Sequence, residues 1–217
     1  TGYSHGAAGI ALALLELYHA TGNPSYYTGA MLGFNFERLH FNATLQNWPD
    51  LRELNPGTAP AAPTYGEAWC HGAPGIALSR LRAWQLTGDE TFRQEAEIAL
   101  NTTHRGIYNA VNGPATQVNF SLCHGLAGNA DIMLEGYRVL GNDVHRQVAE
   151  AAGSYGIEHF CKPHLHWPSG VNDPSGATPG RGTAPGLLLG LAVSVLMLVL
   201  PPPAGLPPAW ADLFGGG

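Results

Sequence analysis

Two short segments each place a cysteine next to a histidine at the expected start of a helix. They are Cys70 with His71 and Cys123 with His124, and each pair precedes a glycine and a stretch that is apolar at helical spacing. Thiolate and imidazole are ligands that zinc prefers, and three protein ligands with an open fourth position are typical of a catalytic zinc. A helix N-terminus would also lower the pKa of a thiol and favour the thiolate. The two segments therefore predict a shared zinc site, if the fold brings them together.

Both pairs belong to an internal repeat that occurs three times. The repeat reads His-Gly-x-x-Gly, then a mostly apolar helix, then Gly-Asn or Gly-Asp, and it covers residues 4–23, 70–89 and 123–142. In the first copy Ser4 and His5 stand where the other copies have Cys and His. The late glycine predicts a left-handed cap that ends one helix, and the following Asn or Asp predicts the start of another. Each copy is thus predicted to open an αα-hairpin whose second helix covers residues 24–41, 90–108 or 144–160.

Hairpins that cannot bury their apolar helices alone are expected to stack on their neighbours. We expect the more apolar first helices inside and the Ala-rich second helices outside, as an all-α, two-layer array that is either a solenoid or a closing toroid. If the inner helices are parallel, the three repeat turns meet at one end of the array. A degenerate fourth copy is expected at 185–200, where Leu189 and Val193 replace the His and the second Gly.

Composition excludes several classes of protein. The chain has 217 residues, 45% of them hydrophobic, only 12% charged and a formal net charge of -6, so it has no basic surface for nucleic acid or anionic membranes. The apolar run 186–200 is shorter than the ~20 residues of a membrane-spanning helix and is interpreted as a buried helix. Three cysteines favour free thiols in a reducing compartment. The abrupt start indicates a fragment.

The residues alone leave simpler interpretations open. Cys70 and Cys123 could be small buried apolar side chains, and the repeated histidines could be structural groups that bond neighbouring carbonyls. His71 in particular is as easily structural as functional. Cys161 could form a second metal site with His159, His164 and His166, but a histidine-rich loop is more often merely polar.

The repeat motifs resemble those of a known family. "SHGAAGIA", "WCHGAPGI" and "LCHGLAGNAD" are similar to successive motifs of lanthionine synthetase C-like proteins, most closely those of the cyclase domain at the C-terminal end of class II bifunctional lanthipeptide synthetases. The resemblance implies an (α/α) toroid, of which this chain would be about the second half. It implies a partial cyclase domain at 1–200, with a Pro/Gly-rich tail at 201–217. It also implies zinc held by Cys70, Cys123 and His124.

The resemblance further implies a reaction. A zinc-dependent cyclase adds cysteine thiolates of a precursor peptide to dehydroalanine or dehydrobutyrine, which forms lanthionine thioether rings. His5 would do the acid/base work. The implied partner is a dehydrated precursor peptide, with an upstream dehydratase domain in the same chain as a further candidate, and the implied location is the cytoplasm. A functional Asp of the family falls before His5, and Gly66 stands where some stand-alone members have Arg, so the catalytic set is incomplete in this chain.

Two rival functions stay open. A six-hairpin (α/α) glycosidase would need paired carboxylates in the central cavity, for which Glu67 and Asp131 are the obvious candidates near the turns. A non-catalytic helical-repeat scaffold would bind a peptide, with zinc structural or absent.

Overall fold

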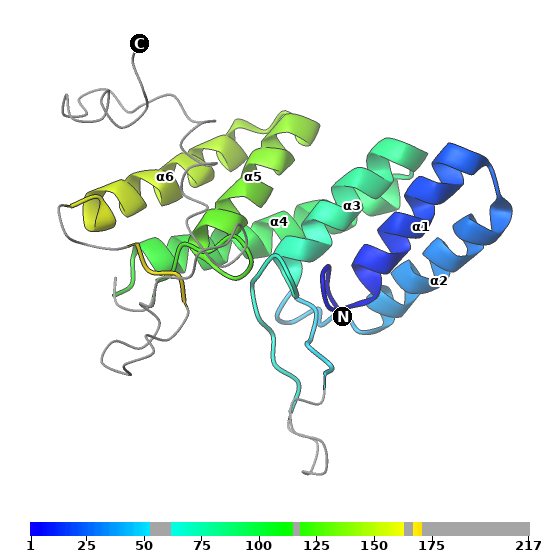
Figure 1. The fold of residues 1–217 in the computed structure, drawn as a ribbon, viewed down its shortest axis with the longest axis horizontal. Coiled ribbons are helices and arrows are strands. Elements are labelled where there is room, and N and C mark those ends of the chain that lie inside the picture. Colours follow the sequence, from blue (N-terminus) through cyan, green and yellow to red (C-terminus); the bar gives the residue numbers. More distant parts are fainter. Residues whose placement is uncertain (53–61, 115–117, 163–166, 171–217) are drawn as a thin grey trace.

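Three helical hairpins make up the part of the chain that the computed structural model describes, which is residues 1–52, 62–114, 118–162 and 167–170. The helices are α1 (Ala7–Thr21), α2 (Pro24–Leu39), α3 (Ala73–Thr87), α4 (Glu90–Val111), α5 (Leu126–Leu140) and α6 (Asp143–Phe160), as Figure 1 shows. These described segments contain isolated β-bridges but no strand. The predicted all-α class is confirmed, and the boundaries of α2, α4 and α6 differ from the predicted ones by no more than three residues.

The hairpin corners follow the repeated sequence signal. Each first helix ends at a left-handed glycine, whose N–H bonds a carbonyl one turn earlier: Gly22 to Tyr18, Gly88 to Trp84 and Gly141 to Tyr137. The next residue then caps the second helix, because its side chain accepts a hydrogen bond two residues on: Asn23 from Ser25, Asp89 from Thr91 and Asn142 from Val144. Local chemistry alone therefore sets where these helices stop and start.

The helices form two layers, as the repeat predicts. α3 packs between α1 and α5, and α2, α4 and α6 each pack on the first helix of their own hairpin, with α4 also touching α5 and α6 (Figure 1). Small side chains allow the layers to approach closely, and the buried alanines of the core include Ala73, Ala77, Ala96, Ala99, Ala127 and Ala130. Every repeat turn consequently lies at the same end of the first-helix layer.

Buried charges tie the first two hairpins together. Arg80 on α3 is fully buried, donates to Glu95 of α4 at 2.5 Å and lies over the ring of Phe34 on α2 at 4.6 Å. Glu95 also pairs with Arg38 of α2. The Glu95 carboxylate therefore pairs with two arginines from two hairpins, which holds α2 against α3 and α4.

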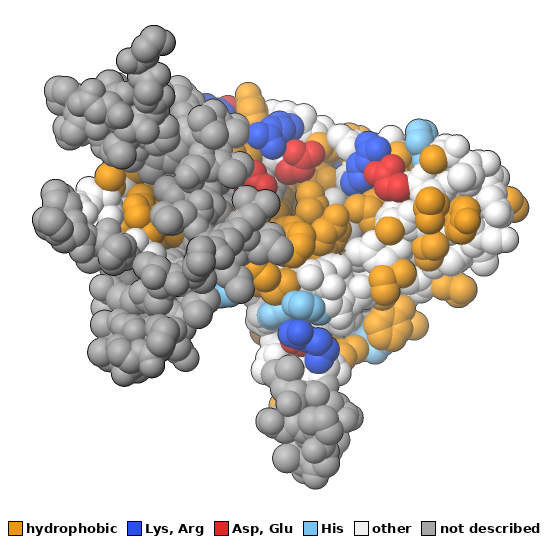
Figure 2. Space-filling view, in the orientation of Figure 1, with side chains coloured by type: hydrophobic (Ala, Val, Ile, Leu, Met, Phe, Trp, Pro, Cys, Tyr) orange, Lys and Arg blue, Asp and Glu red, His pale blue; other side chains and the backbone are white. Residues whose placement is uncertain are grey.

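One face of the first hairpin carries uncovered apolar side chains. Ile10, Leu32 and Leu39 are all strongly exposed, and Figure 2 shows hydrophobic side chains across the surface of α1 and α2. No helix among the described residues has both the length and the apolar character to cross a membrane. The expected fourth copy at 185–200 and the expected tail at 201–217 lie outside the described residues.

Candidate metal centre

The three repeat turns lie side by side and are joined by backbone hydrogen bonds. The N–H groups of Ser4 and His5 both donate to the carbonyl of Cys70, at 3.0 and 3.4 Å. The N–H of Cys70 in turn donates to the carbonyl of Cys123 at 3.4 Å. The turns thus form a row at the N-terminal ends of α1, α3 and α5, which is the arrangement that parallel first helices predict.

The two glycines of each turn are required by close backbone contacts. A Cβ on the first glycine would meet an upstream segment: for Gly6 the carbonyl carbon of Thr1 at 2.2 Å, for Gly72 the carbonyl oxygen of Gly66 at 1.9 Å, and for Gly125 the side-chain oxygen of Asn119 at 2.2 Å. A Cβ on the second glycine would meet the carbonyl oxygen six residues earlier: for Gly9 that of Tyr3 at 2.1 Å, for Gly75 that of Trp69 at 2.3 Å, and for Gly128 that of Leu122 at 1.8 Å. The two glycines of His-Gly-x-x-Gly are therefore needed because no side chain fits where the turn packs against the start of its own helix.

Cys70 and Cys123 bring their thiols together. Cys70 is buried, Cys123 is half-buried, and neither forms a disulfide. Burial, and next the neighbouring thiol of Cys123, raise the pKa of Cys70 to about 11. Burial and the second thiol thus act against the lowering of this pKa that is expected from a helix N-terminus. Two thiols in a desolvated place are a donor pair that a divalent cation would stabilise as thiolates.

His124 is held on the same turn as Cys123. The backbone N–H of His124 donates to the Ser121 hydroxyl at 3.3 Å, and the backbone carbonyl of His124 accepts from the Asn119 side chain at 3.4 Å. Gly170, with φ +77°, packs against the imidazole, and a Cβ there would lie 2.8 Å from Nε2. A side chain larger than glycine at position 170 would therefore collide with the observed position of the His124 ring.

The described residues do not assemble a complete ligand set without metal. Among them, no three His, Cys, Asp or Glu side chains are grouped closely enough to hold a metal ion. The two thiols are adjacent, and His124 directly follows Cys123 in the chain. Two thiols and an imidazole fit zinc by softness.

His5 and His71 flank the second turn. His5 is exposed, with its backbone against the Cys70 carbonyl. His71 is half-buried, and its Nδ1 is buried without a hydrogen-bond partner. Burial is the main cause that lowers the pKa of His71, and the positive charge of His5 adds to the effect. The His5 imidazole therefore lies within electrostatic reach of His71.

The ring of His71 also accounts for Gly66. A Cβ on Gly66 would lie 2.4 Å from Cε1 and 2.7 Å from Nδ1 of His71. A side chain at position 66 and the observed ring position of His71 exclude each other. An arginine at this position would require a different residue, or a different orientation, at 71.

Three asparagines that sequence reasoning missed hold the turns in place. The Asn47 side chain accepts from the Ala73 N–H at 2.8 Å and donates to the Gly66 carbonyl at 3.2 Å. Asn119 accepts from the Ser121 N–H at 3.1 Å, and Asn129 donates to the Glu67 carbonyl at 2.9 Å. None of them recurs in the repeat, so no spacing in the sequence indicates them.

The candidates for a second metal site lie at the end of α6 or outside the described residues. Cys161 directly follows α6, while His159 stacks on Tyr155 with ring centroids 4.1 Å apart and bonds its carbonyl through Nδ1 at 2.9 Å. His164 and His166 lie outside the described residues. The described part thus shows His159 engaged by its own helix.

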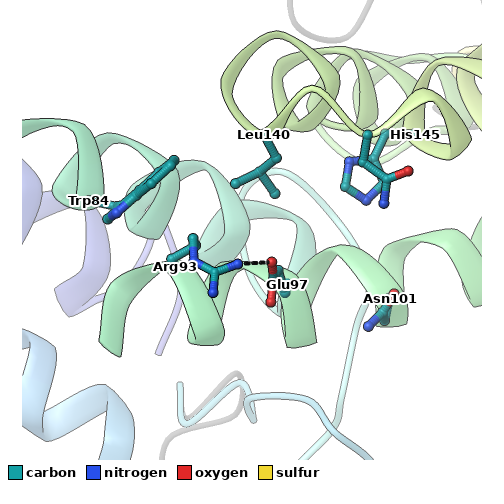
Figure 3. A pocket seen from close by; sticks show the side chains of 7 residues that line it. Trp84, Arg93, Glu97, Asn101, Leu140 and His145 are labelled. Atoms are coloured by element: carbon teal, nitrogen blue, oxygen red, sulfur yellow. Dashed lines mark hydrogen bonds and ion pairs between the residues drawn. The ribbon is translucent and has the colours of Figure 1, made fainter. Parts of the chain in front are cut away.

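A separate pocket lies at the opposite end of the helices. Its volume is about 370 Å³, and Figure 3 shows the side chains that line it from α3, α4 and the α5–α6 corner, which are Trp84, Arg93, Glu97, Asn101, Leu140, Asn142 and His145. Arg93 pairs with Glu97 inside it at 2.5 Å. Because Trp84 and Leu140 belong to the last turns of α3 and α5, this pocket is remote from the repeat turns.

Comparisons with known proteins identify a family and a shared fold. A profile of the family described as lanthionine synthetase C-like protein matches residues 1–173. The lacticin 481/lactococcin biosynthesis protein LcnDR2 of Lactococcus lactis subsp. lactis is 30% identical over 136 residues, which are 60% of this chain and 13% of that protein.

Two solved structures show the same fold. The GH76 alpha-mannanase of Bacteroides thetaiotaomicron matches with a TM-score of 0.60 and 18% identity over 88% of this chain and 50% of its own. Nisin cyclase matches with a TM-score of 0.59 and 18% identity over 91% of this chain and 45% of its own. The chain therefore spans about half the length of these toroids, and the predicted fold of stacked hairpins from part of an (α/α) toroid is confirmed.

Proposed function

We propose that this chain, which belongs to the lanthionine synthetase C-like family, carries the zinc-binding half of a lanthionine cyclase domain. In this role it adds cysteine thiolates of a peptide to dehydroalanine or dehydrobutyrine and so forms thioether rings. The observation that carries the proposal is the meeting of the Cys70 and Cys123 thiols, from two repeat copies, at the starts of α3 and α5. Similarity to a lacticin 481/lactococcin biosynthesis protein supports a peptide as the substrate.

Cys70, Cys123 and His124 would hold the zinc ion. When bound, the metal supplies the positive charge that makes a substrate thiol a thiolate at neutral pH. The protein contributes the desolvated thiol pair, and Gly170 leaves room for the observed position of the His124 ring. Such neighbours of metal ligands orient the ligand and raise affinity for the metal.

His5 would deliver the proton that the α-carbon of the substrate gains. As the thiolate forms the carbon–sulfur bond, the electron pair of the substrate double bond moves toward the adjacent carbonyl, and the resulting enolate must gain a proton. Imidazole exchanges protons at neutral pH. His5 is exposed at the first turn, and its backbone rests on the carbonyl of Cys70. Its side chain is therefore available beside the proposed metal ligands.

The partners follow from the same proposal. A dehydrated precursor peptide would be the substrate, and a dehydratase domain upstream in the same polypeptide would supply it. The reaction would take place in the cytoplasm, where thiols stay reduced. The acidic catalytic residue of the family would come from the half of the toroid that precedes His5.

Glycosidase activity gains no support from the carboxylates. The fold is shared with an alpha-mannanase, but a likeness at 18% identity concerns the fold alone. Glycoside hydrolysis needs two carboxyl groups that face one substrate. The carboxylate of Glu67 instead lies against Gly106 of α4, where a Cβ would be 1.8 Å from Oε2.

A matched pair of histidine variants tests the function. His5→Asn should retain zinc and slow ring formation by about 100-fold, the usual contribution of a positioned acid/base group. His19→Asn is the control, because His19 is exposed in the last turn of α1, the helix that follows the turn of His5. Both are assayed by mass spectrometry on a dehydrated peptide, in the protein purified with any flanking sequence of its natural polypeptide. Absence of rings with zinc-loaded wild-type protein would favour the scaffold alternative, and a wild-type rate for His5→Asn would return this histidine to a structural role.

A further inference from the structure

The first repeat turn is held by a carboxylate from the helix that follows it. Glu37 stands in the last turn of α2, which Figure 1 shows beside the start of α1. Its Oε1 accepts a hydrogen bond from the N–H of Gly2 at 3.1 Å and another from the N–H of Ala8 at 2.9 Å. These two residues lie on either side of Ser4 and His5 in the chain. A single oxygen therefore fixes both ends of the segment that carries His5.

The segment held by this oxygen rests directly on the second repeat turn. Gly2 has a φ of +117°, and a Cβ on it would lie 2.7 Å from Cα of His71 and 3.0 Å from the carbonyl oxygen of Cys70. The N–H groups of Ser4 and His5 donate to the same carbonyl. Because Glu37 holds Gly2, it also sets how the first turn sits on the turn that carries Cys70.

The Glu37 carboxylate has no other hydrogen-bonded partner among the residues that the structure describes. Its side chain is fully buried, and its second oxygen, Oε2, is buried without a partner. The nearby cations Arg38 and Arg80 both pair with Glu95 instead. Burial raises the pKa of the Glu37 carboxyl, so a core position is costly for its charged form. The hydrogen bonds of this costly group thus go to the backbone of the first turn.

The support for the first turn differs from that of the other two turns. Asn47 and Asn119, which bond the second and third turns, stand in connectors, whereas Glu37 belongs to a helix. This helix packs along α1 and is tied to α4 by the ion pair of Arg38 with Glu95. A side chain on a packed helix positions its partner more precisely than one on a loop.

We propose that Glu37 is a positioning residue that holds His5 beside the proposed zinc ligands. The inference rests on the proposed cyclase function, in which His5 delivers a proton to the α-carbon of the substrate. Glu37 takes no part in the proton transfer and instead fixes the backbone that carries the imidazole. A proton is transferred only across hydrogen-bond distance, so a displacement of the turn by about 1 Å would slow this step strongly.

The competing interpretation is that Glu37 only stabilises the fold. A stabilising group changes the fraction of protein that is folded. A positioning residue changes kcat of the folded protein, and it does so only while the residue through which it acts is present. The two interpretations therefore differ in the energetic coupling between positions 37 and 5, which a double-mutant cycle measures.

Three single variants test the effect on the rate in the intact protein. Glu37→Asp keeps the charge but draws the carboxylate back by about 1.5 Å, and it should lower kcat for ring formation by about tenfold at unchanged KM and zinc content. Glu37→Gln keeps the length and an acceptor oxygen and should retain the wild-type kcat. Leu100→Ala is the destabilised control, because Leu100 is buried in α4 against Gly136 of α5, and its kcat should also be that of wild type.

The double variant tests whether Glu37 acts through His5. In a His5→Asn background, Glu37→Asp should cause no further loss of kcat. An equal tenfold loss in both backgrounds would overturn the positioning role, and so would a wild-type kcat for Glu37→Asp alone. A loss of kcat in Leu100→Ala as large as that in Glu37→Asp would attribute the effect to stability and would also overturn it.

Amide hydrogen exchange separates this inference from the cyclase proposal, because it needs no peptide substrate. Glu37→Asp should speed exchange of the Gly2 and Ala8 amides by about tenfold, while the Ala73 amide of the second turn keeps its wild-type rate. Unchanged exchange at Gly2 and Ala8 would refute the role of Glu37 whether or not rings are formed. Faster exchange at these two amides, with no ring formation by zinc-loaded wild type, would contradict the cyclase proposal and leave the placement of the first turn by Glu37 supported.

Discussion

Replacing Gly128 by alanine should push the third repeat turn away from the start of α5. The new Cβ would lie 1.8 Å from the carbonyl oxygen and 2.8 Å from the carbonyl carbon of Leu122. Ordinary contact between such atoms begins at 3.4 Å, so this carbonyl must retreat by well over an ångström. Because Leu122 directly precedes Cys123, the movement displaces the thiol that we assign to zinc.

Gly128→Ala should lower both the stability of the protein and its affinity for zinc, and the two effects can be measured separately. Overpacking against backbone should lower the free energy of unfolding by about 3 kcal/mol. Displacing a metal ligand should weaken zinc binding by about 100-fold, at the upper end of what disturbed neighbours of metal ligands produce. Gly141→Ala, at the other end of α5, is the matched control. No atom lies within 4 Å of its Cβ, but its φ is +69°, so it should cost only about 1 kcal/mol and leave zinc affinity unchanged.

Two assays distinguish these effects. Urea unfolding gives the free energy of unfolding of each variant, and competition with a chromophoric chelator gives the zinc affinity. The steric argument would be refuted if Gly128→Ala were no less stable than Gly141→Ala. If Gly128→Ala were destabilised yet bound zinc as tightly as wild type, the glycine would serve stability without positioning Cys123.

Three further perturbations have defined outcomes. Gly170→Ala should displace the His124 imidazole and weaken zinc binding by about tenfold in the chelator assay. Glu37→Ala should cost about 3 kcal/mol in urea unfolding, because two backbone N–H groups lose their acceptor, whereas Glu37→Gln keeps an acceptor oxygen and should cost far less. Arg52 holds the pKa of Asp50 at about 2, below its value near ~4 in an unfolded chain. The stability difference between wild type and Asp50→Asn should thus be constant above pH ~4 and disappear as pH falls through about 2, and a difference independent of pH would contradict this pairing.

The hairpins were predictable because each boundary has a local cause. A left-handed glycine ends the first helix and the next side chain caps the second, and both signals occupy adjacent positions in every repeat copy. The row of turns followed from repetition, since identical units that pack in parallel bring identical positions together. Cys70 and Cys123 could be paired in this way although 53 residues separate them.

The surroundings of the turns were not predictable from the sequence. Asn47 caps a helix that begins 26 residues later, from a connector that has no repeat pattern. The direction of the Cys70 pKa shift was also missed, because it depends on burial and on a second thiol, while the sequence shows only the helix start. Such contacts arise from tertiary packing of single, non-repeated residues.

Metal content per chain tests the central claim most directly. Elemental analysis of the purified protein, together with any flanking sequence of its natural polypeptide, should give one zinc per chain. Cys70→Ala and Cys123→Ala should each lose the zinc while circular dichroism still reports the helical fold. A folded wild-type protein without zinc, or full zinc occupancy in the Cys123→Ala variant, would contradict the assignment of the two converging turns as a metal centre.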